Sequence, residues 1–261
     1  MTLAADSLLR LSGKDPRRLQ KDGWGVGWFA AGKTPRVVKS ARPIFKEAGR
    51  ARAAAKHAVS GAVIGHVRAA SNPRGIAAAR IMGVRNNQPF SDGRFLFAHN
   101  GTLEIPDEIA ARLGPYRKNL KSLNDSEVFF WQFVKFYDAG RDAGQALADC
   151  VGETRKEWRR CRGRYKHKAG PYTGLNAVVS DGASLHALSL YRSSRGVRSL
   201  GRGTQPWGTM SLRAEAGRVV VSSEPFDGGR WRRLPPGTVV SAVPAGRRIA
   251  VRLRRVQEDA A

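Results

Sequence analysis

The hydrophobic pattern begins with short apolar runs whose length suits buried strands. They occupy residues 22–29, 62–68 and 94–99, and the first run is rich in glycine. A compact apolar run of this length is typical of a buried strand. Glycine inside a strand usually marks a bulge or the close approach of another backbone. We therefore predict early strands at these positions, with residues 37–40 as a hairpin partner of the first.

The middle of the chain changes to a helical pattern. Residues 47–60 are rich in alanine, which has the highest intrinsic helix propensity. Residues 123–137 predict a strong helix, and residues 141–151 predict a second one. A shorter helix is expected at residues 5–12, whereas residues 71–94 carry the Asn, Pro and Gly punctuation of a loop.

Strand patterns return after Thr173. Residues 176–180 and 185–190 flank Asp181 and Gly182, a two-residue hairpin signal. Further strands are predicted at residues 218–222, 238–243 and 248–253. Helices that lie between two groups of strands suit the α+β class, with packed sheets flanked by helices. We expect one such domain over residues 1–261.

The charge suggests what the chain could attract. Its 46 Lys and Arg residues against 21 Asp and Glu residues give a formal net charge of +25. Such a field attracts nucleic acid, polyphosphate or an acidic partner, although a compositional bias towards arginine gives the same total. Residues 155–168 are very basic and are predicted to be an insertion, in which Trp158 and Tyr165 could stack on bases.

Other compositional features exclude several classes of protein. Hydrophobic residues make up 41% of the chain, enough for a substantial core, and no apolar run reaches the length of a membrane span. The first residues lack the pattern of a secretory signal. The two cysteines form neither a disulfide framework nor a zinc quartet. We therefore expect a cytoplasmic protein without a metal or another cofactor.

Polar side chains that could bind a substrate or take part in catalysis lie at the ends of predicted elements. Arg68 ends a strand, where its guanidinium can grip a carboxylate through paired hydrogen bonds. Asn100 and Gly101 follow a strand, where an amide and a backbone N–H can stabilise an oxyanion. Asp125 opens a helix, where its carboxylate can bind an ammonium group. Together these groups could hold an α-amino acid while its side-chain amide is attacked.

Each position also has a simpler explanation when it is taken alone. Most arginines at strand ends are solvated, and Asn-Gly is a strong hairpin signal. Asn124 with Glu127 three residues later fits the outline of a capping box around Asp125. Only the convergence of the three groups on one cavity would separate the two interpretations, so we expect that convergence.

The segments around these positions resemble, in order, the motifs of class II glutamine amidotransferases, and the stand-alone bacterial group most of all. No single motif is specific, but five in the correct order are. The resemblance runs from about Leu8 to about Val243. Its segments are residues 22–25, 65–71, 87–90, 97–103 and 124–127, with later similarity at residues 221–225 and 234–237.

The resemblance implies a fold, an activity and roles for the site residues. The fold is the N-terminal-nucleophile hydrolase αββα sandwich, two mainly antiparallel sheets between helical layers. The activity is hydrolysis of L-glutamine to glutamate and ammonia, with any ammonia acceptor on a separate enzyme. Arg68 would bind the substrate carboxylate and Asp125 its amino group. Asn100 and Gly101 would form the oxyanion hole.

Two positions depart from the family pattern. Gln88 stands where the family usually has histidine. The family nucleophile is an N-terminal cysteine whose own amine acts as the base, whereas Thr2 follows the initiator here. Thr2 leads into the helix predicted at residues 5–12 rather than into a strand. We therefore expect a chain that starts late, lacks the first strand and does not use Thr2 as a nucleophile.

The remaining thiols and imidazoles are weaker candidates. Cys150 lies late in a predicted helix and is expected to be structural. Cys161 has arginine neighbours that would lower its pKa, so we predict a reactive surface thiol without a base. His66 and His99 make an incomplete metal site, and we expect each to pack in a strand with one hydrogen bond.

Three functions therefore stay open. The first is a glutamine amidotransferase whose complete product has an upstream cysteine. The second is a relative that binds glutamine without releasing ammonia, and the third is a module that binds nucleic acid or another polyanion. A missing first strand would also leave strand edges unpaired, which predicts self-association and poor solubility.

Overall fold

The computed structural model describes residues 8–9, 12, 19–30, 34–192, 206–215 and 217–256. Thr2 and most of the helix predicted at residues 5–12 lie outside these ranges. Within them, no helix has both the length and the apolar character needed to cross a bilayer.

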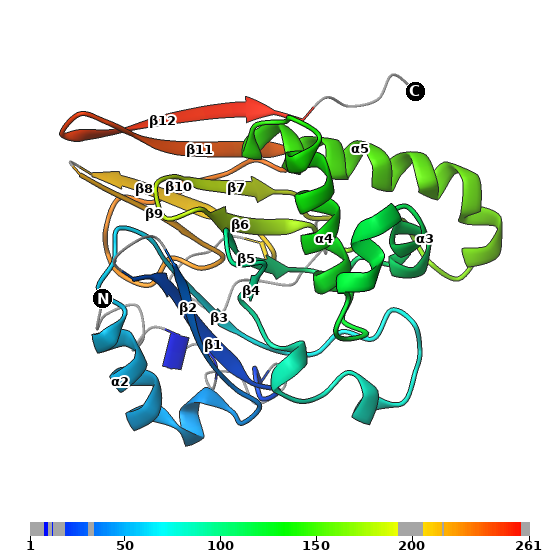
Figure 1. The fold of residues 1–261 in the computed structure, drawn as a ribbon, viewed down its shortest axis with the longest axis horizontal. Coiled ribbons are helices and arrows are strands. Elements are labelled where there is room, and N and C mark those ends of the chain that lie inside the picture. The colour runs from blue at the N-terminus through cyan, green and yellow to red at the C-terminus, as the bar shows by residue number, and fades with distance from the viewer. Residues whose placement is uncertain are drawn as a thin grey trace.

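The largest sheet in the described part of the chain has six antiparallel strands, in the order β12-β11-β7-β6-β5-β4 (Figure 1). Residues 181–184 connect β6 to β7 in a hairpin where the sequence predicted one, and the Asp181 carboxylate accepts a hydrogen bond from the Ser184 N–H at 2.7 Å. The strands are β4 (Phe90–Ser91), β5 (Leu96–Asn100), β6 (Asn176–Ser180), β7 (Leu185–Ser189), β11 (Thr238–Ala245) and β12 (Arg248–Arg255).

Two smaller antiparallel sheets accompany it, each with three strands in the described residues. The first has the order β2-β1-β3, and the second has the order β10-β8-β9. The strands of the first are β1 (Trp24–Phe29), β2 (Pro35–Ser40) and β3 (Val63–Val67). Those of the second are β8 (Ser211–Glu215), β9 (Arg218–Ser222) and β10 (Arg232–Arg233).

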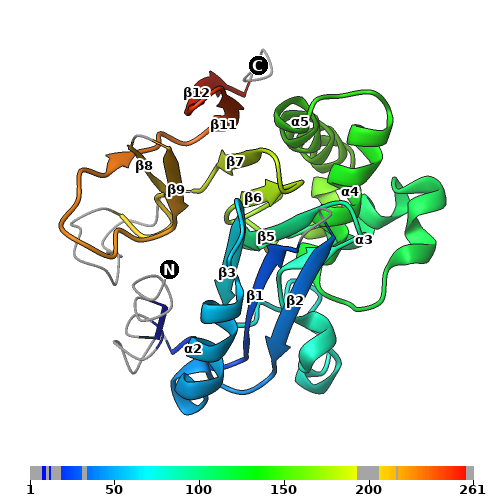
Figure 2. The same ribbon diagram turned by 60° about the vertical axis from the view of Figure 1, so that its left-hand side comes forward.

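Three helices cover one face of the six-stranded sheet (Figures 1 and 2). Aromatic side chains form the contact, and the Phe97 ring of β5 meets the Phe129 ring of the facing helix edge-on at 5.3 Å. The main helices are α2 (Ala48–His57), α3 (Pro106–Ala111), α4 (Asp125–Asp138) and α5 (Ala143–Cys161). The last three form this layer, and the predicted helix at residues 123–137 is confirmed as α4.

The smaller sheets lie on the opposite face of the large one (Figure 2). Phe29 and Ile64 of the first small sheet pack against Leu96 of β5. Leu212 of the second packs against Ala187 of β7. Helix α2 then covers the outer side of the first small sheet. The α+β class with antiparallel sheets is thus confirmed, but the expected second sheet is divided into two.

The glycines of β1 permit the close backbone approach that the sequence predicted. A Cβ on Gly25 would lie 2.1 Å from the carbonyl oxygen of Gln88, well inside van der Waals contact. The loop at residues 71–94 can therefore rest directly on β1.

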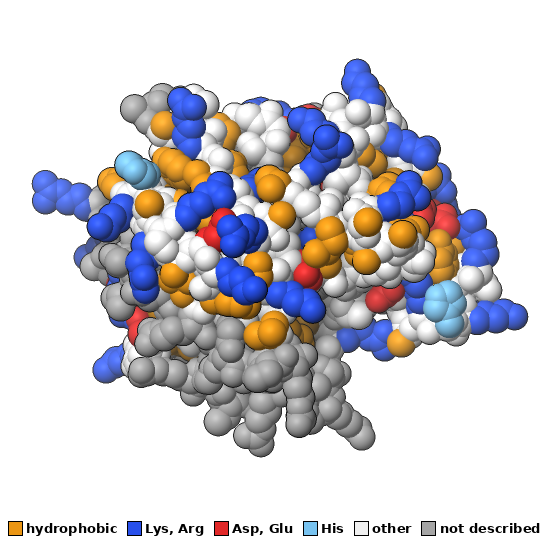
Figure 3. All heavy atoms as spheres, turned by 90° about the horizontal axis from the view of Figure 1, so that it is seen from below, with side chains coloured by type: hydrophobic (Ala, Val, Ile, Leu, Met, Phe, Trp, Pro, Cys, Tyr) orange, Lys and Arg blue, Asp and Glu red, His pale blue; other side chains and the backbone are white. Residues whose placement is uncertain are grey.

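The basic segment at residues 155–168 belongs to the helical layer. Helix α5 runs past the predicted end at residue 151 to Cys161, and a 3-10 turn, η6 (Arg162–Tyr165), follows. The helix continues because Thr154, Glu157 and Cys161 are buried while the basic residues face outward. On the face seen in Figure 3, Lys and Arg side chains are spread among apolar ones and form no single patch.

Candidate functional site

Arg68 is held at the end of β3 by its backbone and buried by its surroundings. Its N–H donates to Gly23 at 2.9 Å, and its carbonyl accepts from Asp22 at 3.0 Å. The side chain is only 4% exposed. Nη2 donates to the Ile81 carbonyl at 2.9 Å, but Nη1 is buried without a hydrogen-bond partner. Arg68 is therefore not a solvated arginine at a strand end.

Burial and nearby carboxylates act in opposite directions on this guanidinium. Burial lowers the pKa of Arg68 from its usual value, and the negative charges of Asp22 and Asp125 partly restore it. No ion pair within 4.0 Å accompanies Arg68 in the described residues. A buried cation with a spare donor favours the binding of an anion.

Asp125 is the first residue of α4, and its carboxylate is 2% exposed. It accepts from the Leu103 N–H at 2.8 Å and from the Ser71 hydroxyl at 3.3 Å. The helix cap is Asn124, whose side chain accepts from the Ser126 N–H at 2.9 Å. Capping is therefore done by Asn124, and the Asp125 carboxylate points elsewhere.

Asn100 and Gly101 do not form a hairpin turn. Asn100 ends β5, pairs with Asn176 of β6 and has an exposed side chain. Gly101 has φ of +144°, and a Cβ there would lie 2.1 Å from the Gly174 carbonyl oxygen. Only glycine fits this conformation and this approach. The strong two-residue hairpin signal was thus misleading, because the chain continues towards α3.

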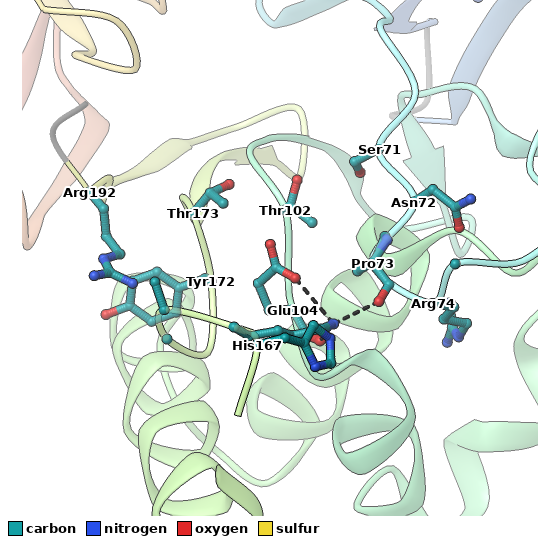
Figure 4. A pocket seen from close by; sticks show the side chains of 14 residues that line it. Ser71, Asn72, Pro73, Arg74, Thr102, Glu104, His167, Tyr172, Thr173 and Arg192 are labelled. Carbon is teal, nitrogen blue, oxygen red and sulfur yellow. Dashed lines mark hydrogen bonds and ion pairs between the residues drawn. The ribbon is translucent and has the colours of Figure 1, made fainter. Parts of the chain in front are cut away.

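Two cavities adjoin these residues. The larger, of about 550 Å³, is lined by Ser71 and Thr102 and bounded by Tyr172 and Arg192 (Figure 4). At its rim the Lys168 ammonium forms an ion pair with Glu104 at 3.2 Å. The cavity is polar, and a ligand there would meet hydroxyl groups beside charged side chains.

The smaller cavity, of about 110 Å³, is lined by Asn100 and His66, with Gly208 and Ser223 on the other side. It separates β3 from the segment that follows β9. Asn100 lines the smaller cavity and Thr102 lines the larger one. These residues are close in sequence, so the two cavities lie near each other.

The site residues predicted from the sequence do not line one common cavity. Arg68, Gly101 and Asp125 line neither cavity, although Asp125 reaches the larger one through Ser71. The structure brings the charges of Arg68 and Asp125 close enough to interact. Asn100 lies apart on the smaller cavity. The roles assigned to these residues stay predictions.

Sequence reasoning missed the structural role of Gln88. Its side chain accepts from the His99 N–H at 2.6 Å and donates to the His99 carbonyl at 3.0 Å. It thereby holds the backbone immediately before Asn100. The only signal was that glutamine stands where the family usually has histidine.

His99 is buried and His66 is half-buried, and the pKa of each imidazole is lowered. His99 contacts the Ser126 hydroxyl at 2.9 Å and the Gly174 carbonyl at 3.0 Å, one more hydrogen bond than expected. Burial lowers the pKa of His99 and brings the pKa of His66 to about 3. The Nδ1 atom of His66 has no hydrogen-bond partner. The described residues contain no group of three side chains that could hold a metal.

The prediction for Cys161 was wrong. Its side chain is 3% exposed, and burial raises the pKa of its thiol, as do the charges of Glu108 and Glu157. The neighbouring Arg160 and Arg164 form ion pairs with those same two carboxylates, which weakens their effect on the thiol. Cys150 is fully buried, and burial raises its pKa well above the usual value. Both shifts disfavour the thiolate, the form in which cysteine acts as a nucleophile.

The two aromatic residues of the basic segment contact each other. The Trp158 and Tyr165 rings stack at 6.4 Å, and both pack against the main core. Thr2, the other candidate from the sequence, lies outside the described residues.

Known proteins resemble the chain over almost its whole length. Residues 3–260 match the family model for class II glutamine amidotransferases. The gamma-glutamyl-hercynylcysteine sulfoxide hydrolase of Mycobacterium tuberculosis is 27% identical over 245 residues, which cover 91% of this chain and 84% of the relative.

Solved structures agree on the fold. A glutamine amidotransferase class II domain protein from Silicibacter pomeroyi superposes with a TM-score of 0.62 at 23% identity, covering 88% of this chain and 90% of the other. The glutamine phosphoribosylpyrophosphate amidotransferase of B. subtilis gives 0.64 at 16% identity, covering 98% of this chain and 47% of the other.

Proposed function

The chain belongs to the class II glutamine amidotransferase family, and from this membership we propose that it binds L-glutamine. Arg68 would receive the α-carboxylate and Asp125 the α-amino group. Asn100 and Gly101 would donate to the oxyanion that forms when the side-chain amide is attacked. Glutamate and ammonia would be the products, and a separate enzyme would accept the ammonia.

The spare donor on Arg68 is the observation that carries this proposal. A buried guanidinium normally has its hydrogen bonds satisfied, because an unpaired charged group in the interior is costly. Here the whole side chain is buried, and Nη1 has no hydrogen-bond partner. A carboxylate would complete it, and the ligand's ammonium would then face Asp125.

The nucleophile is a separate question from binding. Cys150 and Cys161 line neither of the two cavities, and burial raises the pKa of each thiol. We therefore propose that binding and catalysis can be separated in this chain. The alternative is a relative that keeps glutamine binding but has lost catalysis, and so releases no ammonia.

A larger γ-glutamyl amide is a second candidate substrate. The hydrolase from Mycobacterium tuberculosis is named for a γ-glutamyl compound that is bigger than glutamine. The cavity of about 550 Å³ beside Ser71 lies within the range of roughly 300–1,000 Å³ that accommodates larger organic ligands. This space favours an N-substituted γ-glutamyl amide over glutamine alone.

Calorimetric titration tests binding without requiring a nucleophile. We expect L-glutamine to bind and Asp125→Asn to weaken binding by at least about tenfold, or about 1.4 kcal/mol. The asparagine keeps an acceptor for the Leu103 N–H but loses the charge that holds an ammonium. Asp149→Asn removes a carboxylate from a surface ion pair on α5 and should leave binding unchanged.

The same samples distinguish the alternatives. Ammonia release from glutamine would identify an active enzyme, and binding without release would identify a non-catalytic relative. A γ-glutamyl dipeptide that binds more tightly than glutamine would favour the larger substrate. Folded protein that binds neither ligand would refute the proposal. Nucleic-acid binding that falls steeply with salt would support the polyanion module instead.

A further inference from the structure

A third cavity lies outside the candidate site. It measures about 390 Å³ and opens between β2, β4 and the first turns of α4. Lys39 and Val37 face it from alternate positions of β2, and Glu127, Phe130 and Trp131 face it from one side of α4. None of its lining residues belongs to either cavity described above.

The cations of this cavity greatly outweigh its acid. Lys39, Arg85 and Lys121 line it together with the single carboxylate of Glu127. None of the three cations forms an ion pair within the part of the chain that the structure describes. Surface cations usually find partners or full hydration, so three converging on a hollow create a local anion-binding field.

Local hydrogen bonds already occupy Glu127. Its carboxylate accepts from the Lys121 N–H at 3.1 Å and from the Ser122 N–H and hydroxyl, each at 2.7 Å. These bonds fix the loop before α4 and spread the negative charge over backbone donors. The carboxylate is therefore a structural group of the wall and leaves a net positive charge around the cavity.

Lys39 is placed by the packing of the small sheet. It pairs with Gly25 of β1, and a Cβ on that glycine would lie 3.2 Å from the Lys39 Cγ. The ammonium reaches the face of the Phe90 ring, 5.2 Å from its centroid. Burial lowers the pKa of Lys39 to about 8, although Glu127 opposes the shift. An incoming anion would relieve this incomplete solvation.

Most of the remaining wall is apolar and aromatic, with the polar side chains of Ser91 and Asn119 beside it. Phe90 and Phe130 are buried with their rings stacked at 6.3 Å, and Trp131 lies half-buried beside them. Val84 is 49% exposed at the edge of the cavity. An inorganic ion would use the cations and leave this surface wet, whereas a ligand with a flat apolar body would cover it.

We propose that this cavity binds a small phosphorylated ligand with a flat apolar body, the chemistry of a mononucleotide. The phosphate would lie among Lys39, Arg85 and Lys121, and the apolar body would cover Trp131 and Val84. The proposal is independent of glutamine binding, since the two sites share no lining residue.

AMP is the probe, and adenosine and inorganic phosphate separate its two halves. We expect AMP to bind with Kd below about 1 mM and each half to bind at least about tenfold more weakly. Lys39→Gln should weaken AMP binding by about tenfold, because one cation of the cluster is lost. Lys118→Gln removes the same charge from the neighbouring 3-10 turn η5 (Gly114–Asn119). Lys118 is exposed and does not line the cavity, although Asn119 does, so this variant should change AMP binding less than twofold.

A labelling experiment tests the site without a variant. Acetic anhydride acylates neutral amines, and AMP should slow acylation of Lys39 but not of Lys118, as mass spectrometry of the peptides would show. Phosphate binding as tightly as AMP would overturn the assigned ligand class. No AMP binding, equal effects of the two substitutions, or unprotected Lys39 would overturn the site itself.

Discussion

At the scale of single residues, the Gln88 side chain takes the place of a neighbouring strand beside His99. Its amide makes both hydrogen bonds to His99 that an adjacent peptide group would make. Because the His99 ring is also held on both nitrogens, the backbone before Asn100 has little freedom. An oxyanion donor must be fixed before the reaction, since reorganisation costs catalytic power. This arrangement is consistent with the role proposed for Asn100.

Three histidines with lowered pKa values predict how stability depends on pH. Burial lowers the pKa of His66, His99 and His186 below the unfolded value of about 6.5. Below that pH the unfolded chain binds protons that the folded chain does not, so stability falls as pH falls. Each histidine contributes up to about 1.4 kcal/mol per pH unit.

Urea unfolding between pH 7 and about pH 5 measures this slope before most carboxylates titrate. His66→Gln should reduce the slope, whereas His57→Gln, at an exposed position of α2, should leave it unchanged. Stability that is flat or rises over this range would contradict the assignment of neutral buried imidazoles.

At the scale of elements, α5 shows how a basic segment can be part of a core. Its buried positions recur at helical spacing through Leu147, Val151 and Thr154, so one side packs on the large sheet. Arg and Lys residues occupy the other side, where Arg160 forms an ion pair with Glu157, and Arg164 of the following 3-10 turn η6 forms one with Glu108. Such surface pairs contribute little each, so burial must hold the helix in place.

The start of α5 offers a clear test of capping. The Asp142 carboxylate accepts from the Gln145 N–H at 2.9 Å. We expect Asp142→Ala to lower the free energy of unfolding by about 1 kcal/mol, because the N–H loses its acceptor. Asp142→Asn keeps an acceptor and should cost only a few tenths. Equal losses in both variants, measured by urea unfolding, would assign the effect to charge instead.

At the scale of the whole molecule, the second layer is divided into two sheets, and β3 and β9 are edge strands among the residues that the structure describes. Within the described residues β3 pairs only with β1, and β9 pairs only with β8. The cavity of about 110 Å³ lies between β3 and the segment after β9. Unpaired N–H and C=O groups along an edge can template pairing with another chain.

We therefore expect concentration-dependent self-association in sedimentation velocity. The charge of +25 opposes it, so association should increase as salt rises from about 50 mM to about 500 mM. Gly65→Lys puts a charge on the β3 edge and should reduce association, with the Leu8 side chain, 3.0 Å from the new Cβ, moving aside. Gly49→Lys adds the same charge to exposed α2 and should not. A monomer with one cooperative melting transition at every salt concentration would contradict this expectation.

Much of the architecture follows from local pattern. Apolar runs predicted the early strands, alternation predicted the late ones, and the hairpin at Asp181 and Gly182 formed where its signal stood. These features depend on neighbours within a few residues. The pattern failed at Asn100 and Gly101, because whether Asn-Gly turns back depends on a distant backbone, that of Gly174.

The order of motifs was enough to determine the family, since each motif is local and their succession survives without coordinates. Only the tertiary structure decided which side chains lack partners. Arg68 keeps a spare donor and Cys161 is buried because segments far apart in sequence enclose them. The cluster around Lys39 likewise joins β2, a loop and α4. Solvation and charge pairing are sums over spatial neighbours, and a linear pattern does not contain those neighbours.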